Sequence, residues 1–283
     1  MNNFYKKVFG NIFSAEQLNG NLIANFFGLQ VLRYLIAKFL YNLKYISSSF
    51  KDKSMKEDGY KIIENFLSIN DFEELKLEYH KAVNDPKYSF KYLEYGKGVN
   101  ATHVKIDNDL KSNYPNLCAL LNNNNLLSLF EKNELKTKIN LVAKIERIKL
   151  VSKSERDKVK TFHYDTYFHT FKAWLYMNDV ELENGPLEII EKSHKFSFKR
   201  MFNEWITSLS YSLSRDKKTW FGYGLIAQDQ EKISKQSKKM IVKKNTLVFV
   251  NTHGLHRRGD AKLDSVRESV HFYTRENPFK LFF

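Results

Sequence analysis

His163 and Asp165 stand two positions apart in a stretch of threonine and aromatic residues, and this pair constrains the fold most strongly. In an extended strand, residues i and i+2 point to the same face, so the imidazole and the carboxylate lie side by side. They are two thirds of the two-histidine, one-carboxylate set that holds non-haem Fe(II) and leaves positions open for oxygen and a co-substrate. Such pairs also occur by chance on surface strands. A metal site would need a fold that brings a third ligand from elsewhere in the chain.

The C-terminal part of the chain offers two histidines for this role. Residues 246–250 are a β-branched and apolar run of strand length, which leads to His253 and His256. Eleven positions after His256, Arg267 opens a second run with the pattern of a strand. An arginine fork is suited to bidentate capture of a carboxylate. The residues therefore predict an iron site completed by a C-terminal histidine, with Arg267 as a carboxylate anchor beside it.

Five segments in order resemble the phytanoyl-CoA dioxygenase family of Fe(II)- and 2-oxoglutarate-dependent oxygenases. These segments are residues 58–68, 163–165, 171–180, 184–195 and 246–267. The resemblance covers roughly residues 58–276. It implies a mainly β fold, a double-stranded β-helix (a cupin-like jelly roll) with flanking α-helices.

The resemblance also implies roles for individual residues. His163, Asp165 and His256 would bind Fe(II), and His256 is favoured over His253 because its spacing to Arg267 matches the family pattern. The cosubstrate 2-oxoglutarate would chelate the iron through its keto acid end and pair its far carboxylate with Arg267, while O2 takes the last position. Trp174 matches a tryptophan that lines the cosubstrate pocket in relatives.

Three further expectations concern residues near this set. If the last strand is regular, Ser269 shares the inward face of Arg267 and could hydrogen-bond the cosubstrate. Related halogenases carry a small residue at the position of Asp165, so a carboxylate there favours hydroxylation over halogenation. His169 and His194 are expected to be structural.

The implied function is a dioxygenase that hydroxylates an unactivated C–H bond of a small, lipid-like or glycan substrate, with release of succinate and CO2. The alternative is a catalytically silent jelly-roll module that binds an anionic partner, either a membrane surface or a nucleic acid. The net charge of +14 favours anionic partners, and residues 232–244 hold six lysines and no acid. No nucleic-acid-binding motif stands in the chain, so we consider a nucleic acid partner the less favoured one.

The chain divides into a basic, apolar helical extension (residues 1–56) and the oxygenase domain (residues 57–283). Residues 21–46 predict one amphipathic helix, in which Arg33 interrupts any span apolar enough to cross a membrane. Its apolar positions recur at three- and four-residue steps: Leu22, Phe26, Leu29, Leu32, Ile36, Phe39, Leu43 and Ile46. Two interpretations stay open. The stripe packs on the domain or a partner subunit, or it lies in a membrane surface with lysines at the headgroups.

Cysteine usage bears on the compartment. Cys118 is the single cysteine, so the chain forms no intramolecular disulfide. This composition is consistent with a reducing cytoplasm, where Fe(II) also persists. The expected location is cytoplasmic. If residues 21–46 lie in a membrane surface, the protein would be peripheral at a membrane.

Between these motifs, the pattern predicts helices over residues 70–83 and 110–130 and a strand over residues 139–150. Residues 196–220 lie between the iron strand and the distal histidine and are predicted to be helical or irregular. Their aromatic residues are candidates for a substrate pocket or for the core: Phe202, Trp205, Tyr211 and Trp220.

Overall fold

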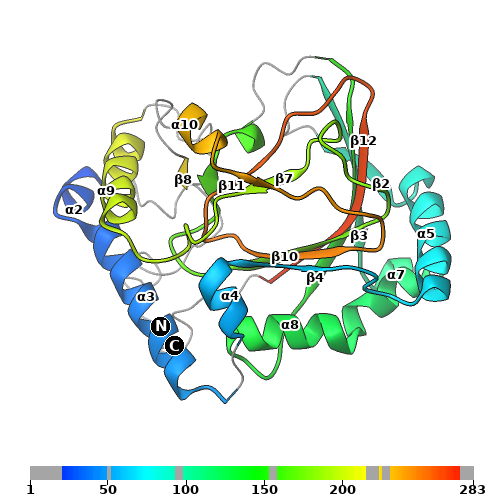
Figure 1. Ribbon diagram of the computed structural model, residues 1–283, viewed down its shortest axis with the longest axis horizontal. Coiled ribbons are helices and arrows are strands. Elements are labelled where there is room, and N and C mark those ends of the chain that lie inside the picture. The colour runs from blue at the N-terminus through cyan, green and yellow to red at the C-terminus, as the bar shows by residue number, and fades with distance from the viewer. Residues whose placement is uncertain are drawn as a thin grey trace.

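The computed structural model describes residues 21–49, 52–92, 98–152, 158–214, 223–224 and 230–274. Two antiparallel sheets form its centre (Figure 1). The seven-stranded sheet contains, in spatial order, β1 (Tyr60–Ile63), β10 (Leu247–Asn251), β6 (Phe171–Tyr176), β12 (Val266–Tyr273), β4 (Val142–Leu150), β3 (Val99–Ile106) and β2 (Ser89–Tyr92). The five-stranded sheet contains β8 (Tyr223–Gly224), β5 (His163–Tyr164), β11 (His256–Arg258), β7 (Leu187–Ile189) and β9 (Lys238–Lys239).

Helices flank these sheets on two sides. They are α2 (Leu22–Phe26), α3 (Leu29–Ser47), α4 (Lys53–Asp58), α5 (Ile69–Asn84), α6 (Asn108–Lys111), α7 (Pro115–Ala119), α8 (Asn124–Glu134), α9 (Phe198–Leu213) and α10 (Gln230–Ser234), with short 3-10 turns η2 (Leu120–Asn122) and η3 (Lys158–Lys160). In Figure 1, α5, α7 and α8 lie along the seven-stranded sheet, whereas α2, α3 and α9 lie at the opposite side of the molecule. The predicted mainly β fold, a double-stranded β-helix with flanking helices, is confirmed.

The largest core lies between the seven-stranded sheet and the helices α5 to α8. Strands alternate in the side they present, and one side of β12 carries Val270 and Phe272 into this core. Phe249 of β10 packs edge to face on Phe130 of α8, with ring centroids 5.0 Å apart. Burial of these side chains in a single layer fixes the sheet against the helices.

The opposite side of the same sheet carries polar and aromatic residues into the space between the sheets. Ser269 lies opposite Tyr176 on one neighbouring strand and Glu146 on the other. His271, two positions on, lies opposite Trp174. This inner face therefore offers the polar and aromatic side chains that a binding site needs.

The secondary structure follows the sequence closely in this domain. The helix predicted over residues 70–83 is α5, and the strand predicted over residues 139–150 is β4. The helical segments predicted around Pro115 are α6, α7 and α8, and Pro115 starts α7, where its missing N–H is tolerated. Of the segment predicted over residues 196–220, α9 is helical, whereas Trp220 lies outside the described residues.

The prediction of one helix over residues 21–46 is wrong in one respect. The segment forms two helices, α2 and α3, which are separated at Gly28. Gly28 has φ of +85°, a left-handed conformation that glycine adopts without strain. Gly28 therefore interrupts the helix, although the apolar residues keep their helical spacing on both sides of it.

Part of the apolar stripe predicted for these helices does not pack on the domain. Phe26, Phe39 and Ile46 belong to that stripe, and all three are exposed. Asn25, Gln30 and other polar residues of the two helices are buried instead, against α9. Among the described residues, no helix combines the length and apolar character needed to cross a bilayer.

Gly28 and Gly59 have the same backbone conformation but different surroundings. Substituting each one measures how much the contact between the end of α4 and His194 contributes to stability. Gly59 ends α4 with φ of +84°, and a Cβ there would run into His194, whose Nε2 contacts the Lys56 carbonyl oxygen at 3.0 Å. At Gly28 the nearest atom to a Cβ is 4.0 Å away. We expect Gly28→Ala to lower the free energy of unfolding by about 1 kcal/mol. Gly59→Ala should lower it by at least about 2 kcal/mol more, because His194 cannot move freely. Urea unfolding of both variants measures this, and equal losses would show that the contact with His194 does not constrain the fold.

Candidate metal centre

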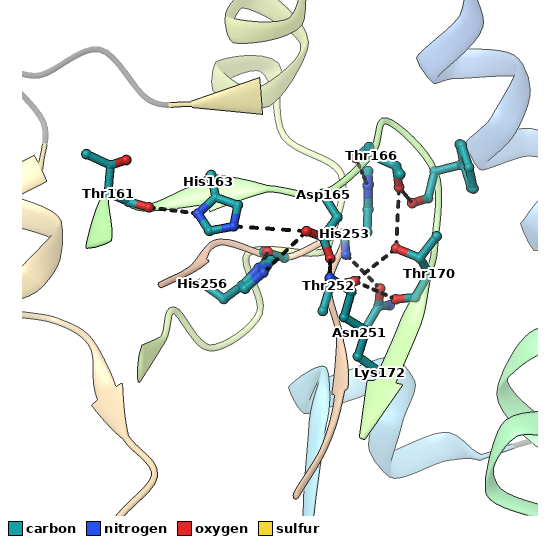
Figure 2. A network of polar contacts seen from close by, with 12 residues as sticks. Thr161, His163, Asp165, Thr166, Thr170, Lys172, Asn251, Thr252, His253 and His256 are labelled. Atoms are coloured by element: carbon teal, nitrogen blue, oxygen red, sulfur yellow. Dashed lines mark hydrogen bonds and ion pairs between the residues drawn. The ribbon is translucent and has the colours of Figure 1, made fainter. Parts of the chain in front are cut away.

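The candidate centre is built on the pairing of two short strands from distant parts of the chain. β5 and β11 run antiparallel, and His163 is the residue directly opposite His256. Directly opposed residues of an antiparallel pair present their side chains on the same face. The two imidazole rings accordingly lie with centroids 4.5 Å apart. Asp165 follows β5 directly and turns its carboxylate to the same side (Figure 2).

The three side chains converge on one point. Oδ1 of Asp165 lies 3.6 Å from Nε2 of His256 and 4.0 Å from Nε2 of His163. One ligand atom from each residue lies within 4.8 Å of the others. These spacings exceed a hydrogen bond and approach the ~3 Å between neighbouring ligands of one ion with ligand distances of ~2.1 Å. The donor set, two imidazole nitrogens and one carboxylate oxygen, fits Fe(II).

The other nitrogen of each imidazole is fixed by the backbone. Nδ1 of His163 lies 2.7 Å from the Thr161 carbonyl oxygen, and Nδ1 of His256 lies 3.0 Å from the Gly254 carbonyl oxygen. A carbonyl oxygen can only accept, so both hydrogen bonds require the proton on Nδ1. That tautomer leaves the Nε2 lone pairs directed at the centre, which is the arrangement a metal-binding histidine needs.

Lys172 controls the second oxygen of the carboxylate. Its Nζ lies 2.8 Å from Oδ2 of Asp165, while Oδ1 faces the two histidines (Figure 2). Burial alone would raise the pKa of Asp165, but Lys172 and the two imidazoles hold it well below its usual value. Asp165 is thus ionised, and one oxygen is presented to the centre while the other is held by a cation. The pattern of residues did not predict this contact, because Lys172 stands seven positions after Asp165, on β6.

His253, the alternative third ligand, has a different role in the structure. Its Nδ1 donates to the Thr166 carbonyl oxygen at 3.2 Å (Figure 2), and its ring packs near Tyr34 and His169. Within the described ranges, His163, Asp165 and His256 are the group whose ligand atoms could hold an ion, and His253 is outside it. The geometry therefore favours His256.

The residues expected to bind the cosubstrate lie on the inner face of the seven-stranded sheet. Arg267 and Ser269 stand two positions apart on β12, and Trp174 lies on the adjacent strand β6. Arg267 is buried and donates to the Gly185 carbonyl oxygen, which fixes its guanidinium. Trp174 stacks on His271 with centroids 4.8 Å apart and an interplanar angle of 3°. The alternation expected for a regular last strand is present.

Two charged clusters near the centre were missed by the sequence reasoning. On the inner face, Glu146 lies 3.3 Å from His103 and 3.1 Å from Lys144. Behind the centre, buried Arg200 of α9 pairs with Glu204 and donates to the Thr166 carbonyl oxygen at 3.1 Å. An arginine and a glutamate four positions apart on a helix usually lie on a solvated face. The spacing of Arg200 and Glu204 therefore did not predict that both are buried.

His169 and His194, which we expected to be structural, make hydrogen-bond contacts with neighbouring protein groups. Nδ1 of His169 lies 2.7 Å from Nδ2 of Asn251, and His194 is held by the Lys56 carbonyl oxygen. Tyr211 of α9 is buried in the aromatic core beneath α3, whereas Phe202 is exposed. Aromatic residues of this segment thus divide between core and surface.

The phytanoyl-CoA dioxygenase (PhyH) family model matches residues 55–242, more than half of the chain. The chain therefore belongs to the phytanoyl-CoA dioxygenase family, whose members are non-haem iron enzymes that use 2-oxoglutarate. The match spans the first two residues of the candidate centre, and the fold adds the third from β11.

Solved structures with the same fold include two enzymes of nogalamycin biosynthesis. The epimerase SnoN, in complex with Fe3+, alpha-ketoglutarate and nogalamycin RO, has a TM-score of 0.54 and 15% identity over 77% of this chain and 79% of that chain. The alpha-ketoglutarate-dependent carbocyclase SnoK has a TM-score of 0.50 and 16% identity over 78% of this chain and 83% of that chain. At these identities the likeness establishes the fold. A search of curated protein sequences found no match.

Metal binding should persist at acidic pH. Burial and neighbouring His256 lower the pKa of His163 to about 3, and burial also lowers the pKa of His256. Because only neutral imidazole binds a metal, depressed pKa values keep the site competent below the ordinary value of about 6.5. We expect Co(II) affinity to change by less than about threefold between roughly pH 7.5 and pH 5.5. Isothermal titration at several pH values measures this. A loss of about tenfold or more over that range would show that the imidazoles titrate normally.

Proposed function

We propose that this protein is an Fe(II)- and 2-oxoglutarate-dependent dioxygenase that hydroxylates a C–H bond of a small-molecule substrate. The observation that carries the proposal is the convergence of His163, Asp165 and His256 within 4.8 Å. When bound, iron and 2-oxoglutarate supply the oxidising chemistry: O2 gives one oxygen atom to succinate and one to the substrate, and CO2 leaves. The four electrons that O2 takes up come in equal parts from the substrate C–H bond and from the decarboxylation of 2-oxoglutarate.

The three proposed ligands define which directions remain for the other reactants. His163 and His256 enter from the five-stranded sheet, and Asp165 enters beside them. Held by these three residues, an ion would keep further positions open for the cosubstrate and oxygen. Asp165 would supply a protein carboxylate to the ion, which supports hydroxylation rather than halogenation.

The inner face supplies the groups that would hold the cosubstrate. Arg267 provides a charged fork for the distal carboxylate, and its bond to the Gly185 carbonyl oxygen restricts its rotation. Ser269, on the same face of β12, offers a hydroxyl, and Trp174 provides a flat apolar wall stacked on His271. Buried placement strengthens each of these interactions relative to water.

The substrate is proposed to be small and lipid-like or a glycan. The complex of SnoN with nogalamycin RO supports a small-molecule substrate for this fold. The excess of basic residues, 46 against 32 acidic ones, supports an anionic group on the substrate or on the surface that presents it. We also propose that the protein works in peripheral contact with a membrane, where a lipid-linked substrate would be met.

Arg267→Ala should weaken 2-oxoglutarate binding about ten- to a hundredfold while iron binding stays nearly intact. A charge-assisted pair contributes about 1.5–3 kcal/mol, which sets that range. The measurement is an anaerobic titration of the Fe(II) protein, followed through the weak visible charge-transfer band of the bidentate chelate.

Arg257→Ala is the matched control for this titration. Arg257 also carries a guanidinium near the centre, but it pairs with Glu188 at 2.9 Å on the five-stranded sheet. Its loss should leave the cosubstrate affinity unchanged. If folded Arg267→Ala protein binds 2-oxoglutarate as tightly as the parent, Arg267 is not the anchor. If the parent shows no band at all, the oxygenase proposal itself is wrong.

A further inference from the structure

α2, α3 and α9 lie together at one edge of the molecule (Figure 1), and the contact between them is polar. Nδ2 of Asn25 donates to Oγ of Ser212 at 2.9 Å, and Nε2 of Gln30 donates to Glu204 at 3.0 Å. Glu204 also pairs with Arg200, so a buried acid, a buried base and two amides fill the space between the helices.

The sides of these helices that point away from the protein are apolar. On α3 the large apolar residues that are exposed recur at steps of three and four: Leu32, Leu35, Phe39, Leu43 and Ile46. Phe39 is 61% exposed and Ile46 is 72% exposed, whereas Asn25 and Gln30 are 0% exposed. The inward side of α3 is mixed, because Tyr34, Ala37 and Leu40 are buried there beside the polar residues. The outward sides carry large apolar side chains, whereas a helix on the surface of a water-soluble domain turns its polar side outward.

The exposed apolar residues of α2 and α9 are continuous. Phe27, 81% exposed, packs edge to face on Phe26 with centroids 5.5 Å apart. Trp205 donates to the Phe26 carbonyl oxygen at 3.2 Å, and its ring lies 5.9 Å from that of Phe202. We call these residues, together with the exposed line on the adjacent helix α3, the apolar face. Its α3 portion, from Leu32 to Ile46, is ~21 Å long, since a helix rises ~1.5 Å per residue.

Such a surface is unfavourable in water and favourable in a lipid interface. Soluble proteins rarely expose contiguous apolar patches of more than a few hundred Å², and larger ones mark interaction sites. Polar residues that hold two helices together, with apolar residues outside, are the arrangement expected where the surroundings are lipid. Aromatic side chains such as Phe26, Phe27 and Phe39 are well suited to the boundary between headgroups and acyl chains.

Charge selects a bilayer over a second copy of the chain. Within the described residues 21–49 and 52–56 there are five Lys or Arg and one acid, a net charge of +4, and the whole chain carries +14. Two copies that met through this edge would bring like charges together, whereas an anionic surface would attract it. Exposed Lys199 stands on α9, and exposed Lys53 and Lys56 stand on α4 together with the acids Glu57 and Asp58.

We infer that the apolar face is a docking surface for an anionic phospholipid bilayer. The helices would lie flat on the membrane, with their polar sides turned to the protein. This deepens the proposed function, on which it rests in one respect, because it names the membrane as the place where the substrate is met.

The same helices connect the docking surface to the candidate centre. Arg200 of α9 donates to the Thr166 carbonyl oxygen, next to Asp165 in the chain. Lys38 of α3 donates to the His194 carbonyl oxygen, and its Nζ lies 3.2 Å from Nε2 of His169. One layer of helices therefore separates the membrane contact from the loop that carries the proposed ligands.

The test is cosedimentation of the full chain with vesicles containing about 30% phosphatidylserine in phosphatidylcholine. The parent protein should bind these vesicles, and added salt should weaken the binding because it screens the basic residues. Phe39→Gln combined with Ile46→Gln should weaken it at least about tenfold, because both side chains leave water on docking.

Ile69→Gln combined with Leu77→Gln is the matched control. These α5 residues are 64% and 63% exposed, similar to the pair on α3, but they lie on the other side of the molecule. The control should bind vesicles like the parent. The Fe(II)–2-oxoglutarate band should be unchanged in both double variants, so a failed docking inference and a failed oxygenase proposal give different results.

Three outcomes would overturn the inference. The parent protein could fail to bind the anionic vesicles. The α3 variant could bind them as well as the parent or the α5 control does. Alternatively, the α3 variant could convert a dimer into a monomer in light scattering while vesicle binding is absent throughout, which would assign the face to a second copy of the chain.

Discussion

The antiparallel pairing of β5 with β11 is the interaction on which the candidate centre depends. It places His163 opposite His256, although 92 intervening positions separate them in the chain. A register shift of one residue would turn one imidazole to the other face, because side chains alternate along a strand. Both strands are short, so their register must be held from outside. The five-stranded sheet, the aromatic core under α3 and α9, and the backbone bonds to Nδ1 of each histidine hold it.

The surroundings of the centre are arranged by charge as much as by packing. Lys172 holds one oxygen of Asp165 and leaves the other for the ion, which restricts the carboxylate to one mode of binding. On the far side, Arg200 binds the Thr166 carbonyl oxygen beside Asp165, and Lys38 binds the His194 carbonyl oxygen in a separate turn. Both cations come from helices that bury polar residues and expose large apolar ones. The features that position the proposed ligands and those that suit a lipid interface thus belong to the same helices.

The sequence predicted the fold class, most elements and the members of the centre, because each follows from local information. The spacing of His163 and Asp165, the apolar runs around β10 and β12, and the order of family segments are all readable in the chain. Lys172 and the Arg200–Glu204 pair could not be predicted, since their contacts arise only when β6 and α9 pack beside β5. The sequence left the orientation of α3 open, because apolar spacing locates an apolar side without stating which medium it faces. The roles of Arg267, Trp174 and Ser269 stay predictions.

The measurement that tests the central claim most directly is metal stoichiometry in two histidine variants. The parent protein should bind one Fe(II) per chain under anaerobic conditions. His256→Ala should lose that ion while its circular dichroism stays that of a folded protein. His253→Ala, which removes an equally buried imidazole nearby, should still bind it. Loss of iron from the His253 variant with retention by the His256 variant, or retention by both, would contradict the assignment of the centre to His163, Asp165 and His256.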